Sequence, residues 1–307
     1  MMRVLFLFLD GVGLGEDDPE RNPFLNARMP HLQGLLGGQM PLRERGRIEA
    51  ERATLIPTDA LLGVPGLPQS ATGQTALLTG VNAARVLGRH WGPWPDATLR
   101  GLLERKSVFK QVADLGRRPY FANAYPQRYF DELDRGRRLS AVPLAAQAAG
   151  LELLLYPALK AGRALSADFT NEGWRDFLGY TDVPLLSLEE AGATLVHLAG
   201  EHDFTLYEYW PLDLLGHRGT MAQAVEALER FDAFLGGILE AMDDGEMLLV
   251  LTSDHGNLED LGTRGHTRNP VPTLLVGVGR EAAAQQIRDL SHIAPALVEA
   301  LAESKRG

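Results

Sequence analysis

The chain has 307 residues, with 40 Asp and Glu against 30 Lys and Arg, a formal charge of −10. Its 45% apolar and 23% charged residues are typical of a folded globular protein and exclude a mainly disordered chain. A nucleic-acid partner is not expected, because no domain-wide basic excess could neutralise phosphates. The chain has no cysteine. Disulfides and cysteine-ligated metals are therefore excluded, and any metal site must use His, Asp, Glu or hydroxyl ligands.

The N-terminus resembles a signal peptide only faintly. The apolar run Val4–Leu9 ends at Asp10, and no small-residue cleavage site follows closely. No apolar run in the chain reaches the roughly 18 residues of a membrane span. We therefore expect a cytoplasmic protein with no membrane partner.

Strand and helix patterns alternate along most of the chain. In order, they predict a strand at Val4–Leu9, a short helix at Pro30–Leu36, a loop over Pro57–Gln69, a helix at Ser70–Leu78 with Ser70 as N-cap, a helix at Leu99–Leu115 closed by Gly116, a strand at Pro119–Ala124, a helix at Leu188–Ala199, a strand at Phe204–Trp210, a helix at Met221–Met242, strands at Met247–Thr252 and Thr273–Val278, and a helix at Ile293–Leu301. This alternation predicts an α/β fold, a mostly parallel sheet with helices on both faces.

Residues 125–186 fit the alternation poorly. They combine a stretch rich in Arg and Asp, an Ala-rich segment and a polar segment. We expect them to form a small cap or insertion on a core made of residues 1–124 and 187–307.

Three of the expected strands run into acidic or histidine residues. These are Asp10 after the first strand, Asp213 and His217 after Phe204–Trp210, and Asp254 and His255 after Met247–Thr252. Ligands of open parallel sheets bind at the carboxyl ends of the strands, so these side chains should converge on one edge. Clustered carboxylates repel one another unless a cation lies among them. The pattern therefore predicts a metal site.

His266 is a candidate third ligand beside Asp213 and His217. It lies in a loop with two prolines, Pro270 and Pro272, that could hold the imidazole rigidly. Three protein ligands would leave an open position for substrate or water. Taken singly, each candidate also has a structural explanation. Asp10 could be a turn residue, Asp254 a helix cap, His217 a helix-surface residue and His266 a solvated loop histidine.

Ser70 begins the segment Ser70–Gly80, which is expected to be helical. Viewed alone, this serine is best explained as a helix cap. Its alternative role is a hydroxyl nucleophile at a helix N-terminus, where the helix dipole and free N–H groups favour an anion such as phosphate.

In this order and spacing, the motifs resemble those of the alkaline phosphatase superfamily, most closely its cofactor-independent phosphoglycerate mutase and phosphopentomutase branch. The similar segments are Leu9–Gly13, Ser70–Gly80, Asp213–His217, Ser253–Asn257, His266–Pro272 and Leu290–Pro295. The similarity covers about residues 1–120 and 187–300 but not 125–186. It implies an alkaline-phosphatase-like three-layer sandwich.

The resemblance also implies a site for two divalent metal ions, Mn²⁺ or Zn²⁺. One ion would be held by Asp213, His217 and His266, and the other by Asp10, Asp254 and His255, with the Ser70 hydroxyl as a further ligand. Ser70 would attack the phosphorus of a small phosphorylated substrate and form a phosphoserine.

The sequence departs from these mutases in two ways. They carry a large second domain that keeps water out, whereas only residues 125–186 could serve here, and Gln74 stands where the mutases tend to have a His. A small lid excludes water poorly, which favours a phosphatase or phosphodiesterase. A phosphomutase is the alternative, and a non-catalytic metal-binding relative is a third. A sulfatase is not expected, because Ser70–Gln74 lacks the Pro and Arg that follow the sulfatase nucleophile.

Substrate contacts are less well defined by the sequence, and the oligomeric state is not defined at all. The candidates for binding substrate are Gln74, Arg85, Arg89 and His90, although the last three fit a solvated basic turn equally well. A second group could line an anion-binding cap, namely Arg128, Arg135, Arg137 and Arg138. Nearby Asp131, Glu132 and Asp134 favour a solvated helix face instead.

Overall fold

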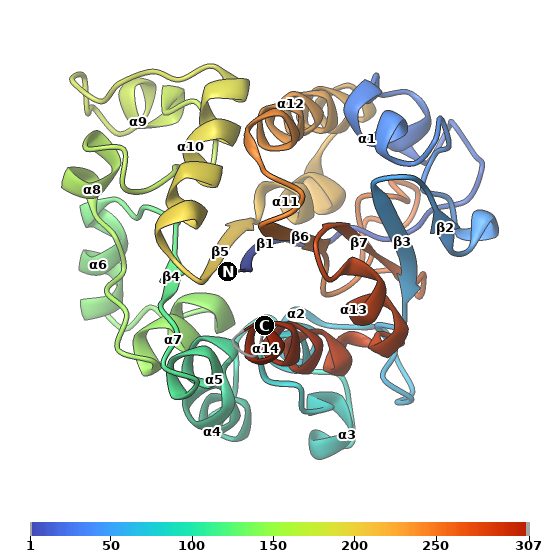
Figure 1. Cartoon of the computed structure of the whole chain (residues 1–307), viewed down its shortest axis with the longest axis horizontal. Coiled ribbons are helices and arrows are strands. Elements are labelled where there is room, and N and C mark those ends of the chain that lie inside the picture. The colour runs from blue at the N-terminus through green and yellow to red at the C-terminus, as the bar shows by residue number, and fades with distance from the viewer. Residues whose placement is uncertain (1, 305–307) are drawn as a thin grey trace.

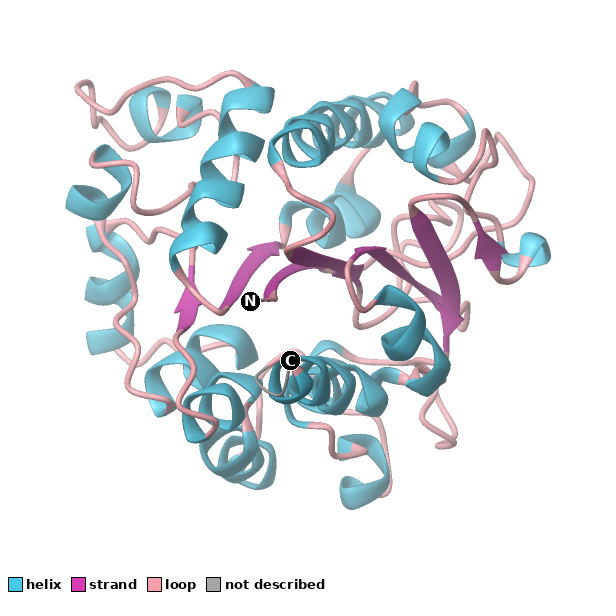
Figure 2. Cartoon of the chain, viewed as in Figure 1, coloured by secondary structure: helices cyan, strands magenta, loops and turns pink. Residues whose placement is uncertain are grey.

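The protein is described by a computed structural model covering residues 2–304, in which one seven-stranded sheet lies between two layers of helices (Figure 1, Figure 2). The strands are β1 (Arg3–Leu9), β2 (Ile48–Glu49), β3 (Ala53–Thr58), β4 (Pro119–Phe121), β5 (Phe204–Tyr209), β6 (Met247–Thr252) and β7 (Val271–Gly277). Their order is β2-β3-β7-β6-β1-β5-β4. The neighbours β6, β1, β5 and β4 are parallel, whereas β7 is antiparallel to β6 and to β3. The expected α/β class is confirmed.

Helices cover both faces of the sheet (Figure 1). One layer contains α1 (Pro30–Leu35), α10 (Leu188–Glu201), α11 (Pro211–Arg218) and α12 (Met221–Ala241). The other contains α2 (Ser70–Thr79), α3 (Ala83–Leu87), α4 (Ala97–Lys106), α5 (Val108–Asp114), α7 (Ala141–Ala148), α13 (Arg280–Gln286) and α14 (Ile293–Glu303). Beyond β4 lie α6 (Gln127–Asp134), α8 (Tyr156–Lys160) and α9 (Glu172–Asp176). Within residues 2–304, no helix has the length and apolar character needed to cross a membrane.

The central strand β1 is packed on both of its faces, which explains why its sequence is continuously apolar. Val4, Phe6 and Phe8 pack into the cluster under α2, α5 and α14, whereas Leu5 and Leu7 pack into the cluster under α10 and α12. A strand buried on both faces needs apolar residues at every position. This double burial fixes the strand, and with it the position of Asp10 at its end.

Two expected elements differ from the structure on the α2 face. The expected helix Leu99–Leu115 is divided at Ser107, which leaves the helical conformation (ψ 148°) and accepts the Lys110 N–H in its side chain. A serine that caps a new helix competes with continuation of the old one. Ser70 is also not the N-cap of α2: Gln69 takes that position and Ser70 is the first helical residue. The N-cap prediction was therefore wrong.

Strand β3 was missed because Pro57 made its sequence look like a loop. In the structure Pro57 lies opposite Pro272 in the β3–β7 pair. Proline has no backbone N–H to donate to the hydrogen-bond ladder between strands. It is therefore tolerated in a strand only at positions where no such hydrogen bond is required.

The segment 125–186 contains a small apolar cluster of its own, with Trp174, Leu159 and Val183 at its centre. Helix α7, in contrast, buries Val142 and Leu144 in the main core. The division into a core of 1–124 and 187–307 and a cap of 125–186 stays a prediction. Met1 and residues 305–307 of that core lie outside the described residues.

Phe204 provides a test of the core on the α2 face. Its ring is fully buried, with its centroid 5.8 Å from that of Phe109 and 6.2 Å from that of Phe6. Phe204→Ala should lower the free energy of unfolding by about 3–5 kcal/mol, since a cavity replaces the ring. Urea denaturation measures the change. Phe177→Ala, at an 86% exposed ring, is the control and should stay within about 0.5 kcal/mol of the parent.

Candidate active site

Three neighbouring parallel strands bring the candidate ligands to one edge of the sheet. Asp10 directly follows β1, and Asp254 comes two residues after β6. Asp213 lies in the first turn of α11, which follows β5. Because β5, β1 and β6 lie side by side, their carboxyl ends place three carboxylates together.

The first ligand group contains Asp213, His217 and His266, whose ligand atoms all lie within 4.8 Å of one another. His217 Nε2 is 3.5 Å from Asp213 Oδ2, and His266 Nε2 is 3.9 Å from Asp213 Oδ1. The i,i+4 spacing of Asp213 and His217 puts both on one face of α11. His266 joins them from the loop between β6 and β7.

The second ligand group contains Asp10, Asp254 and His255, again within 4.8 Å. His255 Nε2 lies 3.5 Å from Asp10 Oδ1 and 3.4 Å from Asp254 Oδ2. The Ser70 hydroxyl reaches this group from the start of α2, with its Oγ 3.0 Å from His255 Nε2. The two groups adjoin, because the rings of His255 and His266 stack with centroids 3.7 Å apart.

Backbone carbonyls orient two of the imidazoles. His217 Nδ1 lies 3.2 Å from the Arg264 oxygen, and His266 Nδ1 lies 2.7 Å from the Pro68 oxygen. An Nδ1–H that donates to a carbonyl leaves Nε2 with its lone pair free, as metal ligation requires. In both residues, Nε2 is the atom that faces Asp213.

Side-chain amides hold the carboxylates. Gln74 Nε2 donates to Asp254 Oδ2 at 3.0 Å and to Asp10 Oδ2 at 3.4 Å. Asn257 Nδ2 donates to Asp213 Oδ1 at 2.7 Å. Such outer contacts fix the direction of a ligand carboxylate and tune its affinity for a metal.

A buried carboxylate, Glu259, links the loops that carry the ligands. Its Oε2 accepts the backbone N–H groups of Gly13 and Asn257, both at 2.8 Å. Its Oε1 accepts from Thr267 Oγ1 at 2.5 Å and Asn269 Nδ2 at 3.0 Å. Gly13 belongs to the loop after β1, and the other three donors belong to the two ends of the long loop between β6 and β7. One side chain therefore ties together the loops that carry Asp10, Asp254 and His266.

The loops approach Glu259 so closely that two positions require glycine. A Cβ on Gly13 would lie 2.2 Å from Glu259 Oε1, and one on Gly256 would lie 2.3 Å from the same atom. Any side chain at either position would displace Glu259.

Crowding of carboxylates raises their pKa values. Burial, and then the charges of Asp254, Asp213 and Glu208, hold the pKa of Asp10 well above its usual range. Burial and the charge of Asp213 raise the pKa of Asp254 to about 7. Glu208, buried in β5, has its pKa raised to about 8 by burial and by Asp254. Within residues 2–304, no Lys or Arg side chain forms an ion pair with any of these three carboxylates.

The residues fit a bound cation. Asp10 Oδ1 is buried and accepts no hydrogen bond from the described residues. A divalent ion would satisfy that oxygen and offset the carboxylate repulsion. Burial also lowers the pKa of His255 and His266, so both imidazoles are in the neutral form that binds metals.

A cavity of about 550 Å³ opens beside the two groups. Its lining includes Asp10, Ser70, Gln74 and His217. It also includes aromatic and basic residues from the segment 125–186, namely Tyr125, Tyr129 and Arg137. The cavity therefore lies between the core and the expected cap.

The structure brings together all seven residues of the expected metal and nucleophile set, which are Asp10, Ser70, Asp213, His217, Asp254, His255 and His266. Their roles as ligands and nucleophile stay predictions. Of the candidate substrate contacts, Gln74 lines the cavity, while Arg85, Arg89 and His90, all within the described chain, do not. Arg89 lies over the Trp91 ring at 4.6 Å, and His90 Nε2 is 3.3 Å from the Val64 oxygen. Substrate binding by these residues also stays a prediction.

Glu208 and Glu259 were not among the sequence candidates. Glu208 is hidden in the apolar strand Phe204–Tyr209, where a carboxylate is itself an unusual signal because ionisable groups are seldom fully buried. Glu259 follows Asp254 by five positions and looks like an ordinary loop residue. Only the folded arrangement of the loop after β1 and the loop between β6 and β7 shows what it binds.

Comparison with known proteins supports a metalloenzyme. The family model "Metalloenzyme superfamily" matches residues 179–305. The 2,3-bisphosphoglycerate-independent phosphoglycerate mutase of Halobacterium salinarum is 37% identical over 131 residues, which are 40% of this chain and 26% of that protein. The matched regions thus span about a quarter of the length of such curated relatives.

Solved structures show the same fold at low identity. Alkaline phosphatase from the Antarctic bacterium TAB5 gives a TM-score of 0.56 at 14% identity, covering 97% of both chains. Phosphoglycerate mutase of Leishmania mexicana gives a TM-score of 0.51 at 12% identity, covering 98% of this chain and 95% of that one. The alkaline-phosphatase-like architecture expected from the sequence is confirmed.

Glu259→Gln tests the link between the loops. In this variant an amide nitrogen replaces one carboxylate oxygen of Glu259. The nitrogen cannot accept the two hydrogen bonds that the oxygen accepted, so the loops that carry the ligands should lose their alignment. We expect divalent-metal affinity, measured by calorimetry, to fall by about 10–100-fold. Glu246→Gln, at an exposed glutamate paired with Arg3, is the matched control and should leave the affinity unchanged. Unchanged affinity in a folded Glu259→Gln protein would contradict this role.

The raised carboxyl pKa values predict an unusual pH dependence for the metal-free protein. Between about pH 7.5 and 9, folded Asp254 and Glu208 together retain protons that the unfolded chain has lost. The free energy of unfolding should therefore fall as pH rises through this window. The unfolded histidines oppose this trend near pH 6.5, where they still carry protons, but above about pH 7.5 His255 and His266 are neutral in both states.

Denaturant unfolding in the presence of a chelator, at several pH values, measures this slope. Glu208→Gln should make the slope shallower, because it removes one of the groups responsible. A free energy of unfolding that stays constant or rises with pH across this window would show that the carboxylates are not crowded as described.

Proposed function

Since residues 179–305 match the metalloenzyme superfamily model and the fold is alkaline-phosphatase-like, we propose that the chain is an alkaline phosphatase superfamily enzyme that catalyses metal-dependent phosphoryl transfer through a phosphoserine at Ser70. The observation that carries the proposal is the position of the Ser70 hydroxyl. It lies 3.0 Å from His255, beside two adjoining groups of metal-ligand type, and faces a cavity. A nucleophile and two cation sites at one cavity form the arrangement that phosphoryl transfer needs.

Two divalent ions are the proposed cofactors. Asp213, His217 and His266 would hold one, and Asp10, Asp254 and His255 the other. Bound there, the ions would activate the attacking hydroxyl and neutralise charge on the phosphoryl group. Three His and three Asp suit either Mn²⁺ or Zn²⁺.

The chain itself orients the nucleophile. Ser70 is the first residue of the ten-residue helix α2, so its hydroxyl and the incoming phosphate lie at the positive end of the helix. The next turn of that helix carries Gln74, which holds Asp10 and Asp254. One helix thus positions both the attacking oxygen and the carboxylates of the adjacent group.

The fate of the phosphoserine distinguishes two activities. Hydrolysis was the primary expectation from the sequence, with a phosphomutase as the alternative. The curated relatives are phosphoglycerate mutases, which favours the mutase: the phosphoryl group returns to the same small substrate at a different oxygen. We therefore place the mutase first for this chain.

Hydrolysis stays as the second candidate because one ligand group is accessible to water. The side chain of His217 is 36% exposed and that of Asp213 is 21% exposed. A mutase must keep water from its phosphoenzyme, and an open group of this kind favours transfer to water. A non-catalytic metal-binding relative would instead bind metal and transfer nothing.

Phosphorus NMR of the products separates these activities. Protein loaded with Mn²⁺ or Zn²⁺ is incubated with phosphoglycerate, a sugar phosphate and an aryl phosphate. A positional isomer with little free phosphate indicates the mutase, and release of inorganic phosphate indicates the hydrolase. Ser70→Ala should lower either rate by at least about 1,000-fold, because the nucleophile is removed.

Ser187→Ala is the matched control, since it removes only an exposed helix-capping hydroxyl that does not line the cavity. Its rate should equal that of the parent. Equal rates in the parent and in Ser70→Ala would refute the phosphoserine. Tight metal binding without transfer on any substrate would favour the non-catalytic relative.

A further inference from the structure

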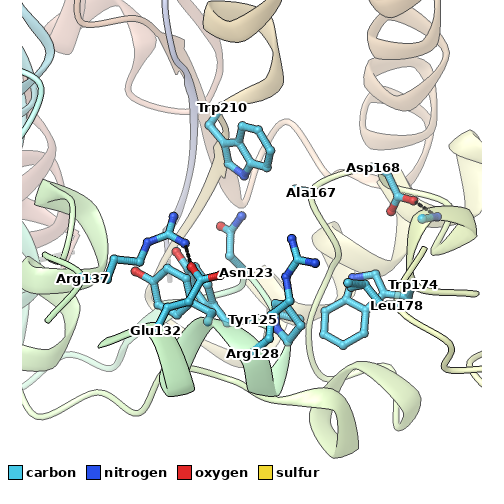
Figure 3. Close-up of a pocket in the computed structure, with 14 residues that line it drawn as sticks. Asn123, Tyr125, Arg128, Glu132, Arg137, Ala167, Asp168, Trp174, Leu178 and Trp210 are labelled. Carbon is cyan, nitrogen blue, oxygen red and sulfur yellow. Dashed lines mark hydrogen bonds and ion pairs between the residues drawn. The ribbon is translucent and has the colours of Figure 1, made fainter. Parts of the chain in front are cut away.

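A second cavity, of about 360 Å³, lies within the segment 125–186 and against the end of β5 (Figure 3). It shares four lining residues with the cavity at the metal-ligand groups, namely Tyr125, Tyr129, Arg137 and Trp210. The two cavities therefore adjoin. A substrate whose phosphate lies at Ser70 has this space available for the rest of the molecule.

Aromatic rings form much of the second cavity. Tyr125 and Tyr129 lie with their centroids 4.5 Å apart, and Trp174 comes from α9 on another side. Trp210 is 46% exposed even though it lies only three residues before the candidate ligand Asp213. Figure 3 shows its indole opposite Tyr125, with the nitrogen turned toward the cavity. Within residues 2–304, no hydrogen bond from that indole N–H is recorded.

The two arginines of the cavity differ in their partners. Arg137 forms an ion pair with Glu132 and lies 4.9 Å over the Tyr129 ring. Arg128 is exposed, and no ion pair or hydrogen bond of its guanidinium is recorded within residues 2–304. In Figure 3 it extends between Tyr125 and Trp174. Its guanidinium is therefore free to stack on a ring or to donate to ring heteroatoms.

We propose that this cavity binds the non-phosphate part of the substrate and that this part ends in a flat heteroaromatic ring. The inference rests on the proposed function, because it takes the phosphate to lie at Ser70. The exposed indole of Trp210 and the unpaired guanidinium of Arg128 are suited to a planar ring with hydrogen-bond acceptors. A phosphoglycerate or a plain sugar phosphate has no flat heteroaromatic ring to stack on the indole and the guanidinium. The volume is within the range of small-ligand pockets.

Two ligands that differ only in the ring provide the test. Adenosine 5′-monophosphate and ribose 5-phosphate carry the same phosphate on the same sugar carbon. Calorimetry on the Mn²⁺-loaded Ser70→Ala protein measures binding of each without turnover. We expect the nucleotide to bind at least about tenfold more tightly, as base stacking on aromatic side chains provides.

Substitutions in the cavity should remove this difference. Trp210→Ala should bring the nucleotide to within about threefold of ribose 5-phosphate while leaving ribose 5-phosphate itself unchanged. Phe177→Ala, at an exposed ring outside both cavities, is the control for loss of an aromatic residue. Arg128→Ala should also weaken only the nucleotide, and Arg135→Ala, on the same segment but outside both cavities, should not.

Equal binding of the two ligands, or binding of neither, would overturn the inference. So would a Trp210→Ala protein that binds both ligands more weakly by the same factor, as general structural damage would cause. The proposed function is judged separately, by transfer from ribose 5-phosphate in the wild-type protein. Ser70-dependent transfer with no preference for the nucleotide would refute the inference and leave the proposed function standing.

Discussion

Four carboxylates that cannot all remain charged without a cation dominate this molecule. Asp10, Asp254, Asp213 and Glu208 meet at the carboxyl edge of the central strands, where burial and mutual repulsion raise the pKa values of three of them. Acidic residues at the ends of three neighbouring strands do not improve the packing of the sheet. The arrangement is understandable only if positive charge is bound there, and the helices, loops and cavity are organised around that edge.

Glu259 shows how such a site is kept rigid. Its four hydrogen bonds connect the loop after β1 with both ends of the long loop between β6 and β7, whose two ends are also bridged at Gly256 and Thr267. Loops are normally the most variable part of an α/β fold. Here a buried acid makes them behave as one unit, so the ligands that they carry keep their relative positions.

Much of the fold and the candidate ligand set could be predicted because their signals are local. An apolar run followed by Asp10, or by Asp254 and His255, is visible in ten residues, and parallel topology then brings these ends together. Glu208 was not predicted because a single acid does not change the appearance of an apolar strand. Ser107 divided a helix because its own capping bond competed with a continuous periodicity.

The aromatic cavity could not be predicted from the sequence for a different reason. Tyr125, Trp174 and Trp210 come from segments about forty to fifty residues apart. No spacing rule connects them, and the arginine-rich stretch around Arg128 favoured a solvated face. Its actual neighbours depend on how α6 and α9 lie beyond β4, which is tertiary information.

Helix α6 contributes Arg128 and Tyr129 to the cavities, yet none of its residues is fully buried. The candidate metal ligands, by contrast, lie at the ends of the central strands or in the helix and loop that follow them. Substitutions on α6 should therefore be tolerated during evolution, whereas those at the sheet edge should not. A protein built in this way can acquire a new substrate by exchanging one surface helix while its inherited chemistry is preserved.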